Sequence, residues 1–167
     1  KNLPALLDAF SRLDAPDVWE GKLAESCVIS DGYKTYTFTL RRGLLWHPPS
    51  VDLDAPQHAW LQGDHPVTAH DVKFTLDLVL NPQVEAGFMK SYFEDCAGAE
   101  VVDDHTVVIR WKKKTYVSID ATLYLAPIPR FLYSCDEHGR PFPAESLGTS
   151  FNSHWYNDKA IGFGPYR

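Results

Sequence analysis

The chain has 167 residues, of which 44% are hydrophobic and 23% are charged. This composition is typical of a globular protein and excludes a disordered one, and the length suffices for one domain with its own core. The formal net charge of −6 argues against nucleic acid or an anionic membrane surface as a partner.

Three cysteines are widely spaced along the sequence: Cys27, Cys96 and Cys135. Because three is odd, at least one stays free or pairs between molecules, and we expect buried, unreactive thiols. No Cys-x-x-Cys motif occurs, so neither a zinc ribbon nor a thioredoxin-like site is expected. No apolar run reaches the length of a membrane span. The chain starts at Lys1 without an initiator Met, so we expect it to be part of a longer protein, and the lack of a signal peptide says nothing about export.

Two elements are predicted near the amino terminus. Apolar residues at helical spacing predict a short amphipathic helix over residues 3–13. Residues 23–40 predict a β-hairpin that turns at Ser30-Asp31-Gly32, where glycine is able to adopt a positive φ. The second arm alternates with period two, which places three large side chains on one face: Tyr36, Phe38 and Leu40.

A proline-rich stretch and a helix follow. Residues 47–66 contain four prolines and predict a long irregular loop, which is either a functional loop or, more simply, a decorative insertion. Thr68 is a good N-cap, with Asp71 placed three residues later to meet the first-turn amides. Asn81-Pro82 ends the helix. Its apolar residues recur at helical spacing: Val72, Leu76, Val79 and Leu80.

The second half of the chain predicts a further hairpin and mixed segments. Residues 83–98 fit a loop with a helical turn, and residues 99–111 predict a hairpin that turns at residues 103–105. Residues 115–125 fit a helix or a mixed element, and residues 135–160 are polar and loop-like. In the helical alternative, four residues share one face: Tyr116, Ile119, Leu123 and Tyr124. Two hairpins with interleaved helices predict an α+β fold.

Four stretches carry a resemblance to a known family. They are Leu-Ala-Glu-Ser at 23–26 leading to Tyr-Thr-Phe-Thr-Leu-Arg at 36–41, Trp-His at 46–47 leading to Pro-Val-Thr-Ala-His-Asp-Val at 66–72, Val-Val-Asp-Asp-His-Thr-Val at 101–107, and Gly-Phe-Gly-Pro-Tyr at 162–166. In this order they resemble the peptide/nickel class of extracellular solute-binding proteins of ABC transporters, family 5. The sequence departs from the family pattern at Cys27, where the family often has Trp, and in the long connection from His47 to Pro66.

The resemblance implies a fold and a division of the chain. The chain would be part of the first lobe, lobe I, of a type II periplasmic binding protein fold. Residues 1–22 would be a flank of that lobe, made of a helix and a linker. Residues 23–160 would be its accessory α+β subdomain, and residues 161–167 a strand returning towards lobe I. The second lobe would lie downstream, outside this sequence.

The resemblance also implies a function. An oligopeptide or a related solute would be captured outside the cytoplasmic membrane by closure of two lobes, and delivered to an ABC permease in the membrane. The location would be periplasmic or extracellular, with a lipid anchor in a segment outside this sequence. No cofactor, no covalent chemistry and no nucleic acid are expected. The alternatives are a sensory or protein-interaction module that uses the same fold, and a hydrolase with a nucleophile and a base in one pocket.

The ligand contacts implied by the resemblance are aromatic residues after the capped helix. Phe88 is the first candidate, and Tyr92 and Phe93 are weaker ones. An apolar ring can stack on a peptide without selecting a particular side chain. The alternative for Phe88 is that its ring packs beneath its own loop.

Other chemistries lack a matching pattern. The seven histidines include no His-Glu-x-x-His, and His65 and His70 lie on either side of a helix cap, so no metal site is expected. Asp71 is expected to serve as an anion at the helix start, and Glu25 as a local hydrogen-bonding partner. Neither a Gly-x-Ser-x-Gly motif nor a phosphate-binding glycine loop occurs, so no catalytic residue is predicted.

Overall fold

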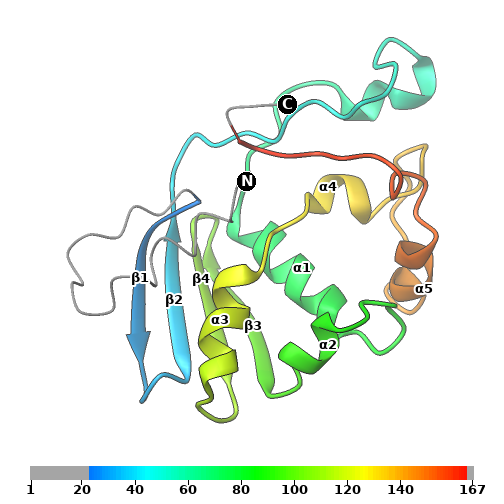
Figure 1. Cartoon of the computed structure of the whole chain (residues 1–167). Coiled ribbons are helices and arrows are strands. Elements are labelled where there is room, and N and C mark those ends of the chain that lie inside the picture. Colours follow the sequence, from blue (N-terminus) through cyan, green and yellow to red (C-terminus); the bar gives the residue numbers. More distant parts are fainter. Residues whose placement is uncertain (1–22, 165–167) are drawn as a thin grey trace.

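The computed structural model describes residues 23–164, and its framework is a four-stranded antiparallel sheet (Figure 1). The strands are β1 (Ala24–Ser30), β2 (Thr35–Leu40), β3 (Cys96–Asp103) and β4 (Thr106–Trp111), in the spatial order β1-β2-β4-β3. Both predicted hairpins are therefore confirmed, and they lie side by side because β2 pairs with β4. The helix predicted over residues 3–13 lies outside the described residues.

The first strand of the second hairpin begins earlier than predicted. Strand β3 starts at Cys96 and not at residue 99, and its pairing register shifts between Cys96 and Gly98. Gly98 has φ +116°, a conformation that favours glycine. This irregularity interrupts the period-two alternation on which the predicted strand boundary depended.

Six helices accompany the sheet. They are the 3-10 helix η2 (Pro56–Leu61) and the α-helices α1 (Ala69–Leu80), α2 (Met89–Tyr92), α3 (Tyr116–Tyr124), α4 (Arg130–Tyr133) and α5 (Leu147–Asn152) within residues 23–164. The structure confirms the predicted helix at α1. Of the two alternatives for residues 115–125, it shows the helix, α3. The α3 helix begins with a capping box in which Thr115 accepts from the Ser118 amide at 3.0 Å.

Three predicted segments differ in detail from the structure. Tyr116 and Leu123 lie seven positions apart on α3 and share a face as expected, but Leu123 is buried whereas Tyr116 is 81% exposed. Tyr116 is the first helical residue, and the contact with the core starts only at Ser118. The loop-like segment 135–160 contains α5 and the fully buried Tyr156, and the irregular segment 47–66 contains η2. In both segments the buried side chains, such as Leu61 and Tyr156, do not recur at a regular spacing, so no helix was predicted.

The core consists of two clusters. The first lies between the sheet and α1, and the apolar faces of β2 and β4 meet there with Val72 and Leu76 from the helix. We call the strands, α3 and this cluster the sheet half. The second cluster joins residues 47–66 and 128–161, which we call the loop half, around Leu61, Leu132 and Tyr156. In Figure 1 the two halves lie on opposite sides of α1.

Helix α1 belongs to both clusters. Val72, Leu76 and Val79 face the sheet half, whereas Phe74 and Leu78 are buried in the loop half. A helix that is apolar on most of its circumference is typical of the interior of a domain. The position of α1 therefore fixes the two halves relative to each other.

Asp71 links the two halves by hydrogen bonds. Its Oδ2 accepts from the Thr68 amide at 2.8 Å and from the Trp46 indole at 3.3 Å, and its Oδ1 accepts from the Arg130 amide at 2.8 Å. The side chain is only 4% exposed. The expected role of this residue as the anion at the helix start is confirmed, and Asp71 in addition ties α4 to α1. None of the helices within residues 23–164 is long and apolar enough to cross a membrane.

Candidate functional site

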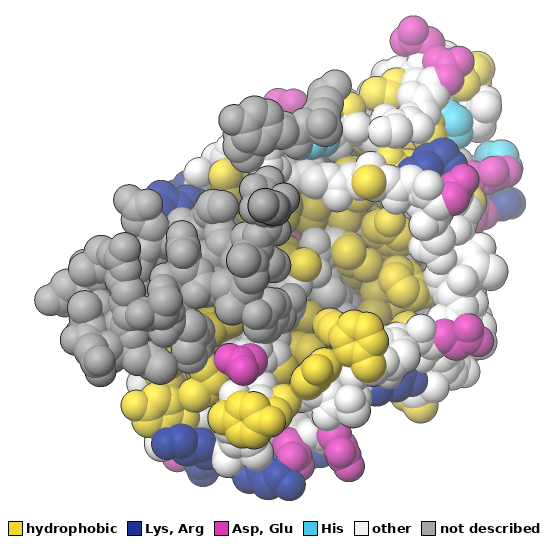
Figure 2. Space-filling model, viewed as in Figure 1, with side chains coloured by type: hydrophobic (Ala, Val, Ile, Leu, Met, Phe, Trp, Pro, Cys, Tyr) yellow, Lys and Arg dark blue, Asp and Glu magenta, His cyan; other side chains and the backbone are white. Residues whose placement is uncertain are grey.

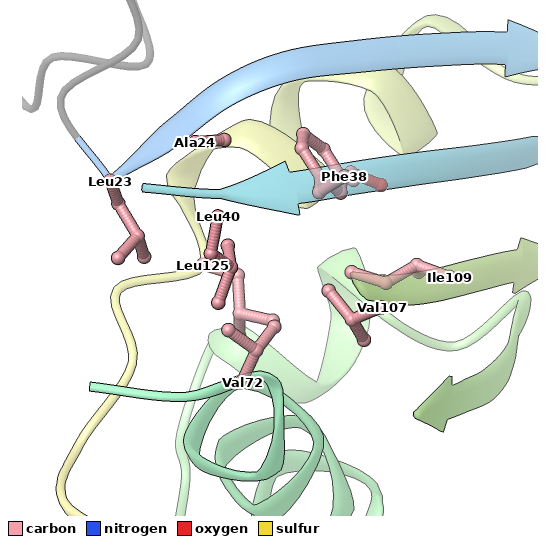
Figure 3. Close-up of a pocket in the computed structure, with 9 residues that line it drawn as sticks. Leu23, Ala24, Phe38, Leu40, Val72, Val107, Ile109 and Leu125 are labelled. Atoms are coloured by element: carbon pink, nitrogen blue, oxygen red, sulfur yellow. The ribbon is translucent and has the colours of Figure 1, made fainter. Parts of the chain in front are cut away.

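A cavity in the sheet half is part of the core packing and not a ligand site. It measures about 30 Å³ and lies among the apolar side chains that Figure 3 shows converging between the strands and α1. The one hydroxyl on its wall, that of Thr122, already accepts from the Trp111 indole at 2.8 Å and donates to the Ser118 carbonyl at 2.7 Å. A space this small without free polar partners stays dry and does not admit a solute.

A larger hollow opens at the surface between α2 and α3. Its volume is about 460 Å³, within the range of small-molecule sites, and it is lined by Phe88, Met89, Tyr92, Phe93, Asp120 and Ala121. We call it the aromatic hollow. Figure 2 shows apolar side chains gathered on this face of the molecule, over the region of α2 and α3. All three aromatic candidates from the sequence thus line one hollow.

The three candidates differ in exposure. Phe88 is 73% exposed and Tyr92 is 47% exposed, and their rings meet edge to face with centroids 5.9 Å apart. The expectation that Phe88 packs beneath its own loop is therefore wrong. Phe93 is 1% exposed and stacks on Trp111, with ring centroids 5.6 Å apart, so it forms the floor of the hollow and part of the core.

The backbone before and within α2 holds Phe88 and Tyr92 outward. Gly87 has φ +54°, which turns the chain just before Phe88, and the Ser91 hydroxyl donates to the Phe88 carbonyl at 2.7 Å. The Lys90 ammonium donates to the Pro82 carbonyl at 3.0 Å and so ties this short helix to the end of α1.

Three residues of the hollow were not predicted from the sequence: Met89, Asp120 and Ala121. Asp120 and Ala121 come from α3, about 30 residues after Phe88, and the approach of α3 to α2 is a tertiary contact without a local sequence signal.

A second hollow of about 420 Å³ contains His65, His70, Arg130 and Cys135 but has no arrangement suited to a metal. The His65 ring stacks on Phe131 with centroids 3.7 Å apart, and His70 faces Asp104 at 3.4 Å. Throughout residues 23–164, no group of three or more His, Cys, Asp and Glu side chains is placed to hold a metal ion. The described histidines instead bond mainly to backbone carbonyls, for example His154 to Cys135 at 2.8 Å.

Two of the three cysteines are held in the thiol form by burial. Cys27, Cys96 and Cys135 are all free thiols. Burial raises the pKa of Cys27 to about 12 and also raises the pKa of Cys96, so the reactive thiolate is disfavoured at both positions. Glu25 lies exposed on β1, and its expected hydrogen-bonding role stays a prediction.

Solved structures with the same architecture define the class of protein. NikZ from Campylobacter jejuni, in complex with Ni(L-His), matches 89% of this chain and 24% of its own with a TM-score of 0.62 at 26% identity. The oligopeptide-binding protein AppA from Bacillus subtilis, in complex with a nonapeptide, matches 89% of this chain and 25% of its own with a TM-score of 0.64 at 22% identity, which speaks to the fold alone. The chain is thus a partial domain of a type II periplasmic binding protein fold.

The family follows from the sequence comparisons. The chain belongs to the bacterial extracellular solute-binding proteins of family 5, whose "family 5 Middle" model matches residues 19–167. A relative from Brucella ovis, named as a peptide-binding protein of an ABC transporter, is 29% identical over 148 residues, which are 88% of this chain and 23% of the relative. The chain therefore spans about a quarter of the length of such relatives.

Proposed function

We propose that this chain forms one wall of the solute site in the substrate-binding component of an ABC importer. The observation that carries the proposal is the aromatic hollow. The chain belongs to a solute-binding family, and it exposes Phe88 and Tyr92 at a hollow of about 460 Å³. A ligand that covers these two rings would remove their apolar surface from water, which favours binding. The ligand is an oligopeptide or a related small solute, and Phe88, Tyr92 and Phe93 are its contacts in this chain.

The proposal includes the division of the chain into three parts. Residues 1–22 are a flank of lobe I, residues 23–160 the accessory subdomain, and residues 161–167 the segment that returns towards the lobe, although residues 161–164 are irregular and do not form the expected strand. Support for the last boundary comes from the segment after residue 160, which runs back beside the chain that follows β2 (Figure 1). The His47 amide donates to the Gly162 carbonyl at 2.7 Å, and Phe163 lies edge-on to Trp46 with ring centroids 5.1 Å apart.

Binding without covalent chemistry is part of the same proposal. Support comes from the family, which is one of solute-binding proteins. The protein would act outside the cytoplasmic membrane, in the periplasm or on the cell surface. A lipid anchor in a segment outside this chain would hold it near an ABC permease, its membrane partner.

The segment 47–66 favours this proposal over a separate interaction module. It is not a free arm, because Leu61 is buried in the core of the loop half and Trp60 donates to the Glu137 carbonyl at 3.2 Å. Gly139 has φ +76° and lies so close to Trp60 that a Cβ would come within 2.7 Å of the indole. The segment is therefore an integral part of the fold.

Native mass spectrometry of the intact protein tests the proposal. We expect a ladder of co-purified masses that collapses on mild denaturation and sequences as short peptides. The double variant Phe88→Ala/Tyr92→Ala should lose most of this ladder, because two exposed rings contribute about 1–2 kcal/mol each to contacts of this kind.

The matched control is Tyr116→Ala, which removes an exposed ring that does not line the hollow. This variant should keep the ladder. A clean mass that stays unchanged after addition of a peptide library would overturn peptide capture. If the double variant and the control lost the ladder equally, the aromatic hollow would not be part of the solute site.

A further inference from the structure

The second hollow, at the start of α1, has an arginine on its wall. This hollow measures about 420 Å³ and lies between residues 65–71 and residues 130–135. We call it the arginine hollow after Arg130, whose side chain is exposed. Within residues 23–164, the Arg130 guanidinium has neither an ion pair nor a hydrogen bond. The cation therefore faces the hollow with its hydrogen-bond donors unused by these residues.

The acids on and beside the arginine hollow are bonded to other groups. Asp71 lines the hollow, but its Oδ1 accepts from the backbone amide of Arg130 at 2.8 Å and not from the guanidinium. Asp136 accepts from the Nε of Arg140 at 2.7 Å, and Asp104 faces a histidine ring at 3.4 Å. None of these three carboxylates neutralises Arg130, so the local charge of the hollow favours an anion.

The backbone on both sides of Arg130 is held in place. Pro129 is fully buried, and the Ile128 amide donates to the Thr75 hydroxyl at 2.9 Å. On the other side, the Ser134 amide donates to the Arg130 carbonyl at 3.0 Å. A charged group on a fixed backbone loses less conformational entropy on binding than one on a mobile loop. Arg130 is therefore already positioned for a ligand.

A flat ring surface lies next to Arg130 in sequence and in the hollow. His65 stacks on Phe131 with ring centroids 3.7 Å apart and an interplanar angle of 5°. The His65 Nε2 bonds to the Leu61 carbonyl at 3.1 Å, which fixes the ring pair to the loop half. Pro66 adds a further apolar side chain to the wall. The hollow thus combines one cation with a planar and largely apolar surface.

The chemistry of these two features decides which ligand fits. A guanidinium presents parallel N–H donors that match the two oxygens of a carboxylate. A ligand that covers Arg130 removes water from it, and an anionic group compensates this loss with charge-assisted hydrogen bonds, whereas a neutral or cationic group does not. The ring pair favours an acid with a planar apolar body, because stacking removes the apolar surface of both from water.

We propose that the arginine hollow binds a small organic acid, with Arg130 as the counter-ion of its carboxylate and the His65–Phe131 ring pair as the surface for its apolar body. This site does not depend on the proposed solute site. The arginine hollow lies at the first turn of α1, whereas the aromatic hollow lies at α2, beyond the last turn (Figure 1). Because α1 has 12 residues, its two ends are about 18 Å apart.

Ligand-detected NMR titration of the intact protein with three probes tests this inference. Benzoate carries both features, benzamide has the same shape without the charge, and acetate has the carboxylate without the ring. We expect benzoate to bind about 10-fold more tightly than either of the others, since the charged hydrogen bonds and the covered ring each contribute at least one such factor. Equal affinity for benzoate and benzamide, or for benzoate and acetate, overturns the inference.

The variant Arg130→Gln should weaken benzoate binding about 10-fold and leave benzamide binding unchanged. The matched control is Arg42→Gln, which changes the net charge equally at an exposed position after β2 and should change neither. Equal weakening in the two variants would show that benzoate responds only to overall charge, and would overturn the site. Circular dichroism of both variants checks that the fold is intact.

Failure of this inference and failure of the proposed function are separate results. The double variant Phe88→Ala/Tyr92→Ala should leave benzoate binding unchanged, whatever its effect on the peptide ladder. Absence of benzoate binding to the wild-type intact protein overturns the arginine hollow as a site and leaves solute capture intact. If Arg130→Gln then also lowers the urea midpoint of unfolding, the partner of Arg130 is an acidic side chain of the same protein outside this chain.

Discussion

The sheet half and the loop half are held together by different means. The sheet half stacks regular apolar faces, so that alternate residues of β2 such as Tyr36 and Phe38 are buried in its core cluster. The loop half contains only short helices and relies on single anchors, of which Tyr156 is fully buried. The Tyr156 hydroxyl also accepts from the Ser50 amide at 2.7 Å, across 106 positions of sequence. The difference teaches that a core can form either from periodic faces or from a few large, well-bonded side chains.

The largest expected loss of stability tests whether the loop half depends on Tyr156. We expect Tyr156→Ala to lower the free energy of unfolding by about 3–5 kcal/mol, because it opens a large cavity and leaves the Ser50 amide without a partner. Ile109→Ala, at a buried position of the sheet half, serves as the reference, at about 2–5 kcal/mol. Urea unfolding gives both values. A loss below about 1 kcal/mol for Tyr156→Ala alone would show that the loop half is peripheral to the stability of the fold.

An intermediate effect is expected at Asp71, which joins the two halves. Asp71→Asn places an amide NH2 where a carboxylate oxygen accepted from a backbone amide, so at least one buried donor loses its partner. We expect a loss of about 2 kcal/mol. Asp77→Asn on the same helix removes only an exposed pair with Lys73 and should cost about 0.5 kcal/mol or less. Equal losses in the two variants, measured by urea unfolding, would contradict the linking role of Asp71.

The smallest effect is a pH dependence located in the loop half. His154 is buried, and desolvation lowers its pKa below the ordinary value of 6.5. Its Nδ1 accepts from the Tyr156 amide at 3.2 Å, a bond that only the neutral ring can make while Nε2 donates to the Cys135 carbonyl. The unfolded chain therefore takes up this proton at higher pH than the folded one. The stabilisation is complete above the unfolded pKa and is lost as the pH falls through the folded pKa.

A comparison of unfolding midpoints at about pH 7.5 and about pH 5.5 measures this dependence. The wild-type protein should lose more stability between the two conditions than His154→Asn, which does not titrate. If both proteins lose the same amount, the pH dependence arises from other groups, and His154 contributes only packing.

Sequence patterns predicted the sheet half far better than the loop half. Alternation in residues 35–40 and the cap at Thr68 are local signals, and the structure follows them closely. Tyr156 and Trp60 have no periodic neighbours, so their burial depends on contacts with distant residues that no local pattern encodes. The same reasoning applies to the site: its three aromatic candidates lie within six positions of each other, whereas Asp120 reaches the hollow only through the packing of α3 beside α2.

The pairing of β2 with β4 has a consequence for the kinetics of folding. Each hairpin closes over a few residues, but Thr35 pairs with Arg110 and Phe38 with Val107, partners that are about 70 positions apart. Isolated two-stranded hairpins are only marginally stable in water, and long-range pairing is the slow step in chains of this kind. Because the entropy of loop closure grows only logarithmically with length, the long segment between the hairpins delays their meeting very little beyond what a shorter one would. The encounter of two transient hairpins over α1 should therefore set the rate at which this chain becomes native.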